Sequence, residues 1–94
     1  MKAVVVSSFG GPDVLKVQER HAPVPQANQV VIETAAASVN FADIMARQGR
    51  YHGGGQPPFV PGLDVAGTIK SVGREVRHLG VGQRVIAFPL TGSY

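Results

Sequence analysis

The stretch "VPGLDVAGTIKSVG" (residues 60–73) contains a turn signal and then a strand. Pro61 and Gly62 punctuate the chain, and the β-branched residues after them predict a strand over 63–73. Gly67, inside that strand, predicts a bulge or the close approach of another backbone. Asp64 stands at the beginning of the strand, which raises the question of what its carboxylate faces.

Four other segments carry strand patterns. The clearest is "VVIETAAASV" (30–39), whose alanine triplet predicts that another part of the chain packs closely against it. The remaining strands are predicted at 2–8, 15–22 and 84–89. Five strands separated by Gly- and Pro-rich turns, with a single short helix, predict a mainly β fold of the antiparallel barrel or roll type.

The one predicted helix covers residues 41–48, within "SVNFADIMARQG" (38–49). Asn40 stands where an N-cap belongs, and Gly49 is placed to end the helix in the left-handed conformation. Asp43 and Arg47 are spaced i, i+4 with the acid first, which predicts an ion pair worth about 0.3 kcal/mol. The residues alone leave open whether Asn40 only caps the helix or also faces a ligand.

Composition limits the class of protein. Ninety-four residues suffice for one domain, and the chain has no cysteine, so neither disulfides nor thiolate chemistry is available. The lack of cysteine suits a reducing compartment, and we expect a cytoplasmic protein. The valine run near the amino terminus is too short for a signal peptide, and no segment has the length of a membrane span.

Three local patterns suggest other functions. "HGGG" (52–55) matches the oxyanion loop of some esterases, but the chain lacks the G-x-S-x-G nucleophile elbow that such enzymes need. The three histidines share no metal-ligand spacing, so we expect no metal site. The basic residues around 70–84 would suit nucleic acid. The strands lack the stacking aromatics of nucleic-acid-binding barrels, however, and a solvated charged turn is the better interpretation.

Taken together, several stretches resemble the medium-chain dehydrogenase/reductase superfamily. They are "SFGGPDVLKV", "SVNFADIMARQGRYH", "PPFVPGLDVAGTIKSVG" and "GVGQRVIAF", in this order and spacing. The most similar branch is that of the zinc-free quinone oxidoreductases, which includes zeta-crystallin and VAT-type proteins. The resemblance implies an amino-terminal GroES-like domain, a partly open antiparallel β-barrel with one short helix, over residues 1–94.

The resemblance also bears on metal binding. Zinc-dependent relatives carry a Cys where Asn40 stands and a His where Leu63 stands, and both are zinc ligands. A neutral amide binds zinc poorly and a leucine cannot bind it, so the resemblance implies that no zinc is bound. The resemblance then implies that the Asp64 carboxylate is retained at a position where no metal is bound.

The implied activity is hydride transfer from NADPH to a quinone or an α,β-unsaturated carbonyl. The resemblance implies that Asn40 and Met45 contact the cofactor, Asn40 near the nicotinamide ribose. It also implies that Tyr51, Leu63 and Asp64 line the substrate cleft, with Pro61-Gly62 turning the chain toward it. No residue is identified as a general acid, and the catalytic residues stay unassigned.

The chain has no G-x-G-x-x-G turn after a strand, which dinucleotide binding would require. The cofactor domain is therefore expected beyond Tyr94, and the 94 residues alone are expected to be inactive. The alternative is a non-enzymatic GroES-like module that binds a partner or itself. We also expect a homo-oligomer, because "RVIAF" (84–88) would present an apolar strand edge.

Overall fold

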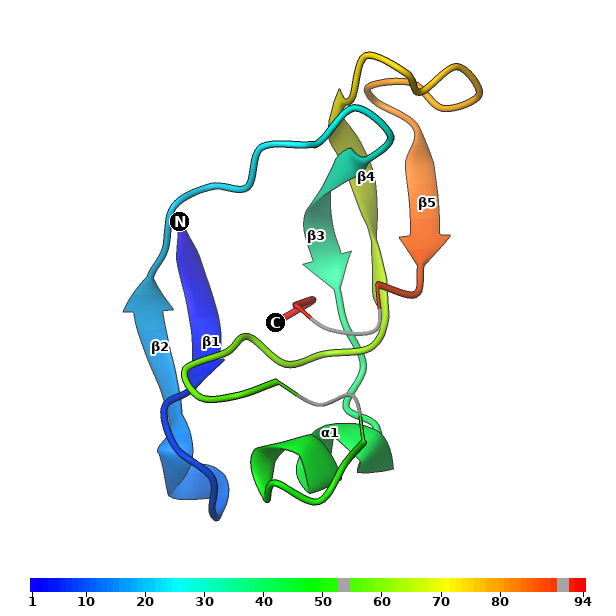
Figure 1. The fold of residues 1–94 in the computed structure, drawn as a ribbon. Coiled ribbons are helices and arrows are strands. Elements are labelled where there is room, and N and C mark those ends of the chain that lie inside the picture. The colour runs from blue at the N-terminus through cyan, green and yellow to red at the C-terminus, as the bar shows by residue number, and fades with distance from the viewer. Residues whose placement is uncertain (53–54, 90–91) are drawn as a thin grey trace.

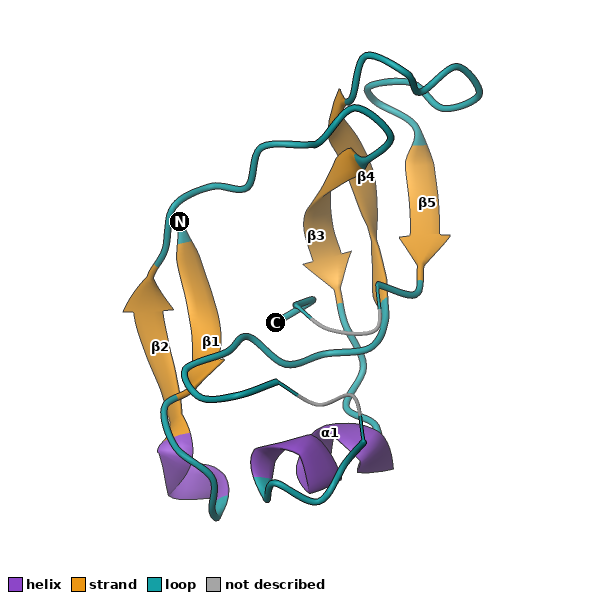
Figure 2. Cartoon of the chain, viewed as in Figure 1, coloured by secondary structure: helices purple, strands orange, loops and turns teal. Residues whose placement is uncertain are grey.

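The structure, a computed structural model, describes residues 1–52, 55–89 and 92–94. Within them the order of elements confirms the predicted five strands and one helix (Figures 1 and 2). Gly53 and Gly54 of the "HGGG" stretch lie outside the described residues. The elements are β1 (Lys2–Val6), the 3-10 turn η1 (Pro12–Val14), β2 (Leu15–Glu19), β3 (Val30–Ala36), α1 (Phe41–Arg47), β4 (Val65–Val72) and β5 (Arg84–Ala87).

The strands form two antiparallel sheets that do not close into a complete barrel. One sheet pairs β1 with β2, and the other has the order β3-β4-β5. Figure 1 shows the two sheets on opposite sides of the molecule, with α1 below them and the carboxyl end between them. The mainly β, partly open architecture predicted from the sequence is confirmed.

The core lies where β1 faces the rest of the chain. Val5 and Val6 are fully buried, and Ile69 of β4 is 1% exposed. β1 also anchors two irregular segments. Val6 and Phe59 exchange backbone hydrogen bonds of 2.8 and 3.2 Å, and the Val4 N–H donates to the Tyr94 carbonyl at 3.4 Å. The loop before β4 and the carboxyl end are thereby held against β1.

All five strands are shorter than the sequence patterns predict, and at the end shared by β3 and β4 the cause is clear. The prediction placed strands over 30–39 and 63–73, whereas β3 ends at Ala36 and β4 begins at Val65. Beyond that point the Ser38 N–H donates to the Asp64 carboxylate at 2.8 Å instead of to a neighbouring strand. A side chain thus replaces the ladder where the two strands part.

Gly67 of β4 confirms the expected close approach of backbone. It pairs with Thr34, beside a register shift between Thr34 and Ala36 that leaves Ala35 unpaired. A Cβ atom at position 67 would collide with the Glu33 carbonyl oxygen and the Ile32 side chain. Only glycine allows the two strands to approach this closely.

The helix ends as predicted, but its expected ion pair is wrong. Gly49 has φ +78°, the left-handed conformation of a helix end. Arg47 does not pair with Asp43. Its Nε donates to the Gly10 carbonyl at 3.1 Å, which ties the helix to the turn before η1. Asp43 points back to Asn40, whose backbone N–H donates to Asp43 Oδ2 at 2.9 Å.

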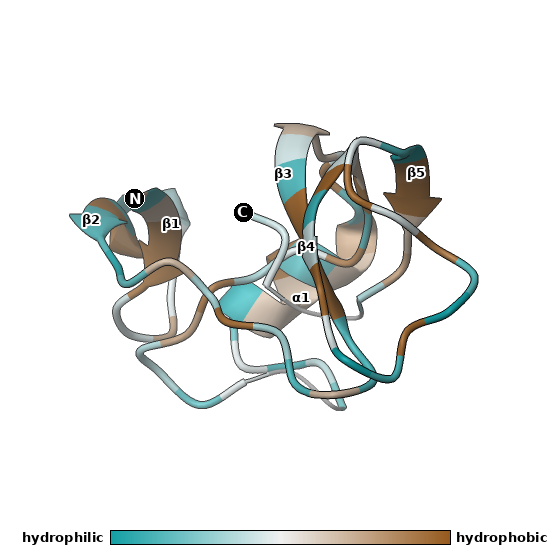
Figure 3. Cartoon of the chain, turned by 90° about the horizontal axis from the view of Figure 1, so that it is seen from above, coloured by the Kyte–Doolittle hydropathy of each residue, from teal (hydrophilic) through white to brown (hydrophobic). Residues whose placement is uncertain are grey.

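The alanine triplet was expected to pack under another segment, and this is also wrong. Ala35, Ala36 and Ala37 are all exposed. The hydropathy colouring in Figure 3 shows apolar residues on β5 at the outer side of the same sheet, and Ile86 is 85% exposed there. Small side chains on β3 therefore border an uncovered apolar face.

None of the described helices is long and apolar enough to cross a membrane.

Candidate functional site

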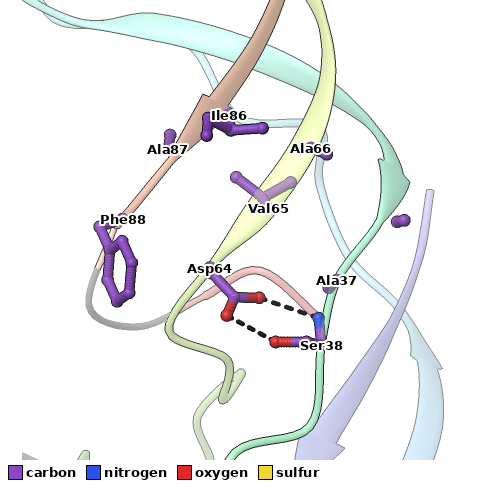
Figure 4. A pocket seen from close by; sticks show the side chains of 9 residues that line it. Ala37, Ser38, Asp64, Val65, Ala66, Ile86, Ala87 and Phe88 are labelled. Carbon is purple, nitrogen blue, oxygen red and sulfur yellow. Dashed lines mark hydrogen bonds between the residues drawn. The ribbon is translucent and has the colours of Figure 1, made fainter.

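The carboxylate of Asp64 is the centre of a polar cluster where β3 and β4 part. Ser38 donates to it twice, through its N–H to Oδ1 at 2.8 Å and through its hydroxyl to Oδ2 at 2.5 Å (Figure 4). The Asn40 amide nitrogen donates to the same Oδ2 at 3.0 Å. Positions 40 and 64, which are far apart in sequence, are therefore in direct contact, and this answers what Asp64 faces.

These bonds fix the orientation of the Asn40 amide. An ionised carboxylate can only accept, so the group that faces Asp64 must be the NH₂ group of Asn40. The same NH₂ group lies 3.3 Å from the Ser38 hydroxyl oxygen, which is itself only 2.5 Å from Asp64 Oδ2, so one amide hydrogen is shared between these two neighbouring acceptors. The second amide hydrogen points away from them. The carbonyl oxygen shares in a capping box with Asp43.

A second carboxylate lies on the other side of Asn40. Asp43 is 6% exposed and, in the described part of the chain, forms no ion pair with a cation. Its Oδ2 accepts from the Asn40 backbone N–H at 2.9 Å and from the Tyr94 hydroxyl at 3.2 Å. A buried carboxylate must be compensated by donors, and here a backbone amide and a phenol provide them.

The cluster shifts the pKa values of Asp64 and Tyr94 in opposite directions. The Ser38 hydroxyl, the Ser38 N–H and the Asn40 amide together hold the pKa of Asp64 below its ordinary value. Burial, followed by the charge of Asp43 and the hydrogen bond to it, raises the pKa of Tyr94 to about 12. At neutral pH Asp64 is therefore ionised and Tyr94 keeps its proton, so each group acts in the role that its bonds require.

An open hollow of about 680 Å³ adjoins this cluster beside β4 and β5. Figure 4 shows Asp64 at one end of it, with Ile86 and Phe88 along the opposite side. Its other lining residues are small or aliphatic: Ala36, Ala37, Ser38, Val65, Ala66 and Ala87. The hollow is thus an apolar surface with one carboxylate at its end.

The predicted site residues are only partly brought together. Asn40 and Asp64 are bonded directly, and Leu63 adjoins Asp64 in a half-buried position after Gly62, whose φ of +112° turns the chain. Met45 is half-buried in α1, and Tyr51 is 38% exposed. Neither Met45 nor Tyr51 shares a hydrogen bond with the Asp64 cluster in the described residues, so their roles stay predictions.

The sequence interpretation missed Ser38 and Tyr94 as members of the cluster. Tyr94 is 30 residues after Asp64 by their numbers, and no local pattern links it to the helix. Ser38 gave a weak signal, because a serine two residues before an N-cap often bonds to a nearby polar group.

As for metals, the described residues contain no group of three His, Cys, Asp or Glu side chains that could hold an ion.

The fold and the cluster define a class of protein, and sequence comparison agrees with it. The chain is an open β-domain with one short helix, and its polar cluster lies where the helix begins. Residues 26–93 match the alcohol dehydrogenase GroES-like domain family. The chain belongs to this family.

Individual relatives indicate the branch. The chain is 46% identical over 86 residues to a quinone oxidoreductase of Lama guanicoe, covering 90% of this chain and 26% of the relative. The human synaptic vesicle membrane protein VAT-1 homolog-like protein superposes with a TM-score of 0.96 at 34% identity, over 100% of this chain and 30% of its own. The resemblance to the quinone oxidoreductase and VAT-type branch is confirmed.

A third relative was solved with a cofactor. The quinone oxidoreductase of Escherichia coli, complexed with NADPH, has a TM-score of 0.85 and 31% identity, over 92% of this chain and 26% of its own. The chain spans between about a quarter and a third of the length of these three relatives.

Proposed function

We propose that this chain is the substrate-side domain of a zinc-independent, NADPH-dependent oxidoreductase that reduces quinones or α,β-unsaturated carbonyls. A cofactor-binding domain from a further segment would complete the enzyme. The proposal is supported by the relatives that are quinone oxidoreductases, one of them complexed with NADPH. Bound NADPH supplies the hydride, and the protein orients the reactants and excludes water.

The observation that carries the proposal is the fixed amide of Asn40. Asp64 and Ser38 share one amide hydrogen, which fixes the plane of the amide and leaves its second hydrogen unused by them. A ligand at this position can therefore accept from that hydrogen or donate to the carbonyl oxygen, as a ribose hydroxyl or a carboxamide does. The nicotinamide end of NADPH carries both groups. The sequence has no G-x-G-x-x-G turn for its pyrophosphate, so we expect that group to bind elsewhere.

The second candidate is a non-enzymatic GroES-like module that acts through association. The uncovered apolar face at Ile86 and Phe88 favours it, since these side chains are 85% and 73% exposed. Patches of this kind commonly mark an interface. The two candidates differ in a direct way, because only the enzyme requires Asn40 for turnover.

The chain should bind no zinc at the Asn40 and Leu63 positions. An amide and a leucine offer no thiolate or imidazole, and the described residues hold no cluster of metal-binding side chains. Elemental analysis after purification without chelators checks this. One zinc per chain would contradict the zinc-independent assignment.

The isolated 94 residues should show no measurable affinity for NADPH. One amide acceptor contributes too little without a helix start that binds the pyrophosphate. Calorimetric titration of NADPH into the chain measures this directly. Binding in the micromolar range would mean that the cofactor site lies within this chain.

The isolated chain should associate with itself, in line with the homo-oligomer proposed for the protein. In the described residues β5 pairs only with β4, so its other edge is free to add a strand from a second copy. We expect dimers or larger species on the order of tens of micromolar. Light scattering over a dilution series tests this, and Ile86→Lys, which puts a charge on the edge, should be monomeric. A wild-type chain that remains monomeric at high concentration would contradict the prediction.

The proposed activity is tested in a chimera. This chain replaces the matching segment of the Lama guanicoe quinone oxidoreductase, to which it is 46% identical. The chimera should oxidise NADPH in the presence of a quinone, and the host protein without its amino-terminal segment should not. A folded chimera that binds NADPH but does not reduce the quinone would favour the non-enzymatic module.

A further inference from the structure

The last residue of the chain contacts the site through its phenol. Tyr94 is half-buried, and its hydroxyl donates to Asp43 Oδ2 at 3.2 Å. The same oxygen accepts the Asn40 backbone N–H at 2.9 Å. Two donors from distant parts of the chain thus meet at one carboxylate oxygen, and one of them is the backbone of Asn40, whose amide donates to Asp64.

Tyr94 is held in place independently of this bond. Its N–H donates to the Pro61 carbonyl at 3.0 Å, and its carbonyl accepts from Val4 at 3.4 Å. A Cβ atom on Gly62 would collide with Ser93 and with the Tyr94 ring, so glycine at position 62 leaves room for that ring. The backbone therefore presents the phenol to Asp43 from a fixed position.

We propose that Tyr94 is a positioning residue for Asn40, acting through Asp43. The phenol holds the carboxylate of Asp43, and the carboxylate holds the Asn40 N–H. The backbone of Asn40, and with it the direction of its amide carbonyl, is thereby set from two sides, by Tyr94 with Asp43 and by Ser38 with Asp64. The phenol is protonated at physiological pH, as a donor must be, and burial together with Asp43 raises the pKa of Tyr94 to about 12. The functional part of the proposal rests on the proposed function.

The first test uses the 94-residue chain without any ligand. Tyr94→Phe removes the hydroxyl and keeps the ring. Hydrogen exchange of the Asn40 N–H, followed by NMR, should become at least fivefold faster. The Gln48 N–H, which donates to the Ile44 carbonyl at 3.1 Å, reports on the helix and should keep its exchange rate. In an Asp43→Ala background, Tyr94→Phe should have no further effect on Asn40, because the shared acceptor is gone.

Two results would overturn the proposal. One is an unchanged exchange rate at Asn40 in Tyr94→Phe. The other is equal acceleration at Asn40 and Gln48, which would mean that the phenol stabilises the fold in general.

A second test links the network to turnover in the chimera. Tyr94→Phe should lower kcat/KM about threefold to tenfold in the otherwise unchanged chimera and have no effect when Asn40 is already alanine. Equal losses in both backgrounds would contradict positioning through Asn40. An inactive chimera would refute the proposed function alone, because the exchange experiment on the isolated chain decides the positioning role without it.

Discussion

Asn40→Ala should lower the turnover of the chimera with NADPH and a quinone at least tenfold, or about 1.4 kcal/mol in the barrier. The substitution removes the whole amide of Asn40, including the hydrogen that Asp64 and Ser38 do not take. It also removes the N-cap of α1, which should cost about 1 kcal/mol of unfolding free energy. Steady-state kinetics and thermal unfolding measure the two effects separately.

Asn40→Ser is the matched control for the cap. Serine caps helices about as well as asparagine, so stability should recover most of the loss. Its hydroxyl is too short to reproduce the amide, so turnover should stay low. If both variants turn over at the wild-type rate while the alanine variant melts earlier, Asn40 is only a cap.

Gly67→Ala should destabilise the domain by about 3 kcal/mol, near the upper end of what overpacking costs. The new methyl group would collide with the Glu33 carbonyl, so β3 and β4 would have to separate where they pair most closely. For a domain of this size, we expect a fall in Tm of roughly 12–24 °C.

Gly80→Ala is the control for this prediction. A Cβ atom at position 80 would have no other atom within 4 Å, and the φ of Gly80 lies outside the left-handed region. It should change stability by no more than about 0.5 kcal/mol. A Gly67→Ala variant as stable as Gly80→Ala would show that the strands can separate at little cost.

The fold was predictable because its signals are local. Strand patterns, glycine turns and a helix-capping signal predict all five strands and α1. Gly67 in turn predicts the close pairing of β3 and β4. Strand ends were less accurate. At β3 and β4 the ladder stops because Asp64 takes the Ser38 N–H, and a side chain that competes with a strand leaves no periodic signal.

The site was predictable only where residues could be compared with the family. Asn40 and Asp64 were identified in that way, and the structure brings them within 3.0 Å of each other. The link from Asp43 to Tyr94 depends on tertiary contacts across 51 positions, which spacing rules do not cover. The i, i+4 rule instead predicted that Asp43 pairs with Arg47. In the structure both residues form hydrogen bonds to tertiary partners in place of that ion pair.

The most direct measurement of the central claim is transfer of deuterium by the metal-depleted chimera. An α,β-unsaturated ketone is the best acceptor, because a hydride delivered to its β-carbon stays on carbon, whereas a proton from water goes to the α-carbon. With NADPH deuterated at the transferred position of C4, we expect one deuterium at the β-carbon of the saturated product and an unchanged rate after exhaustive chelation. Product without deuterium, or activity that returns only when zinc is added, would contradict it.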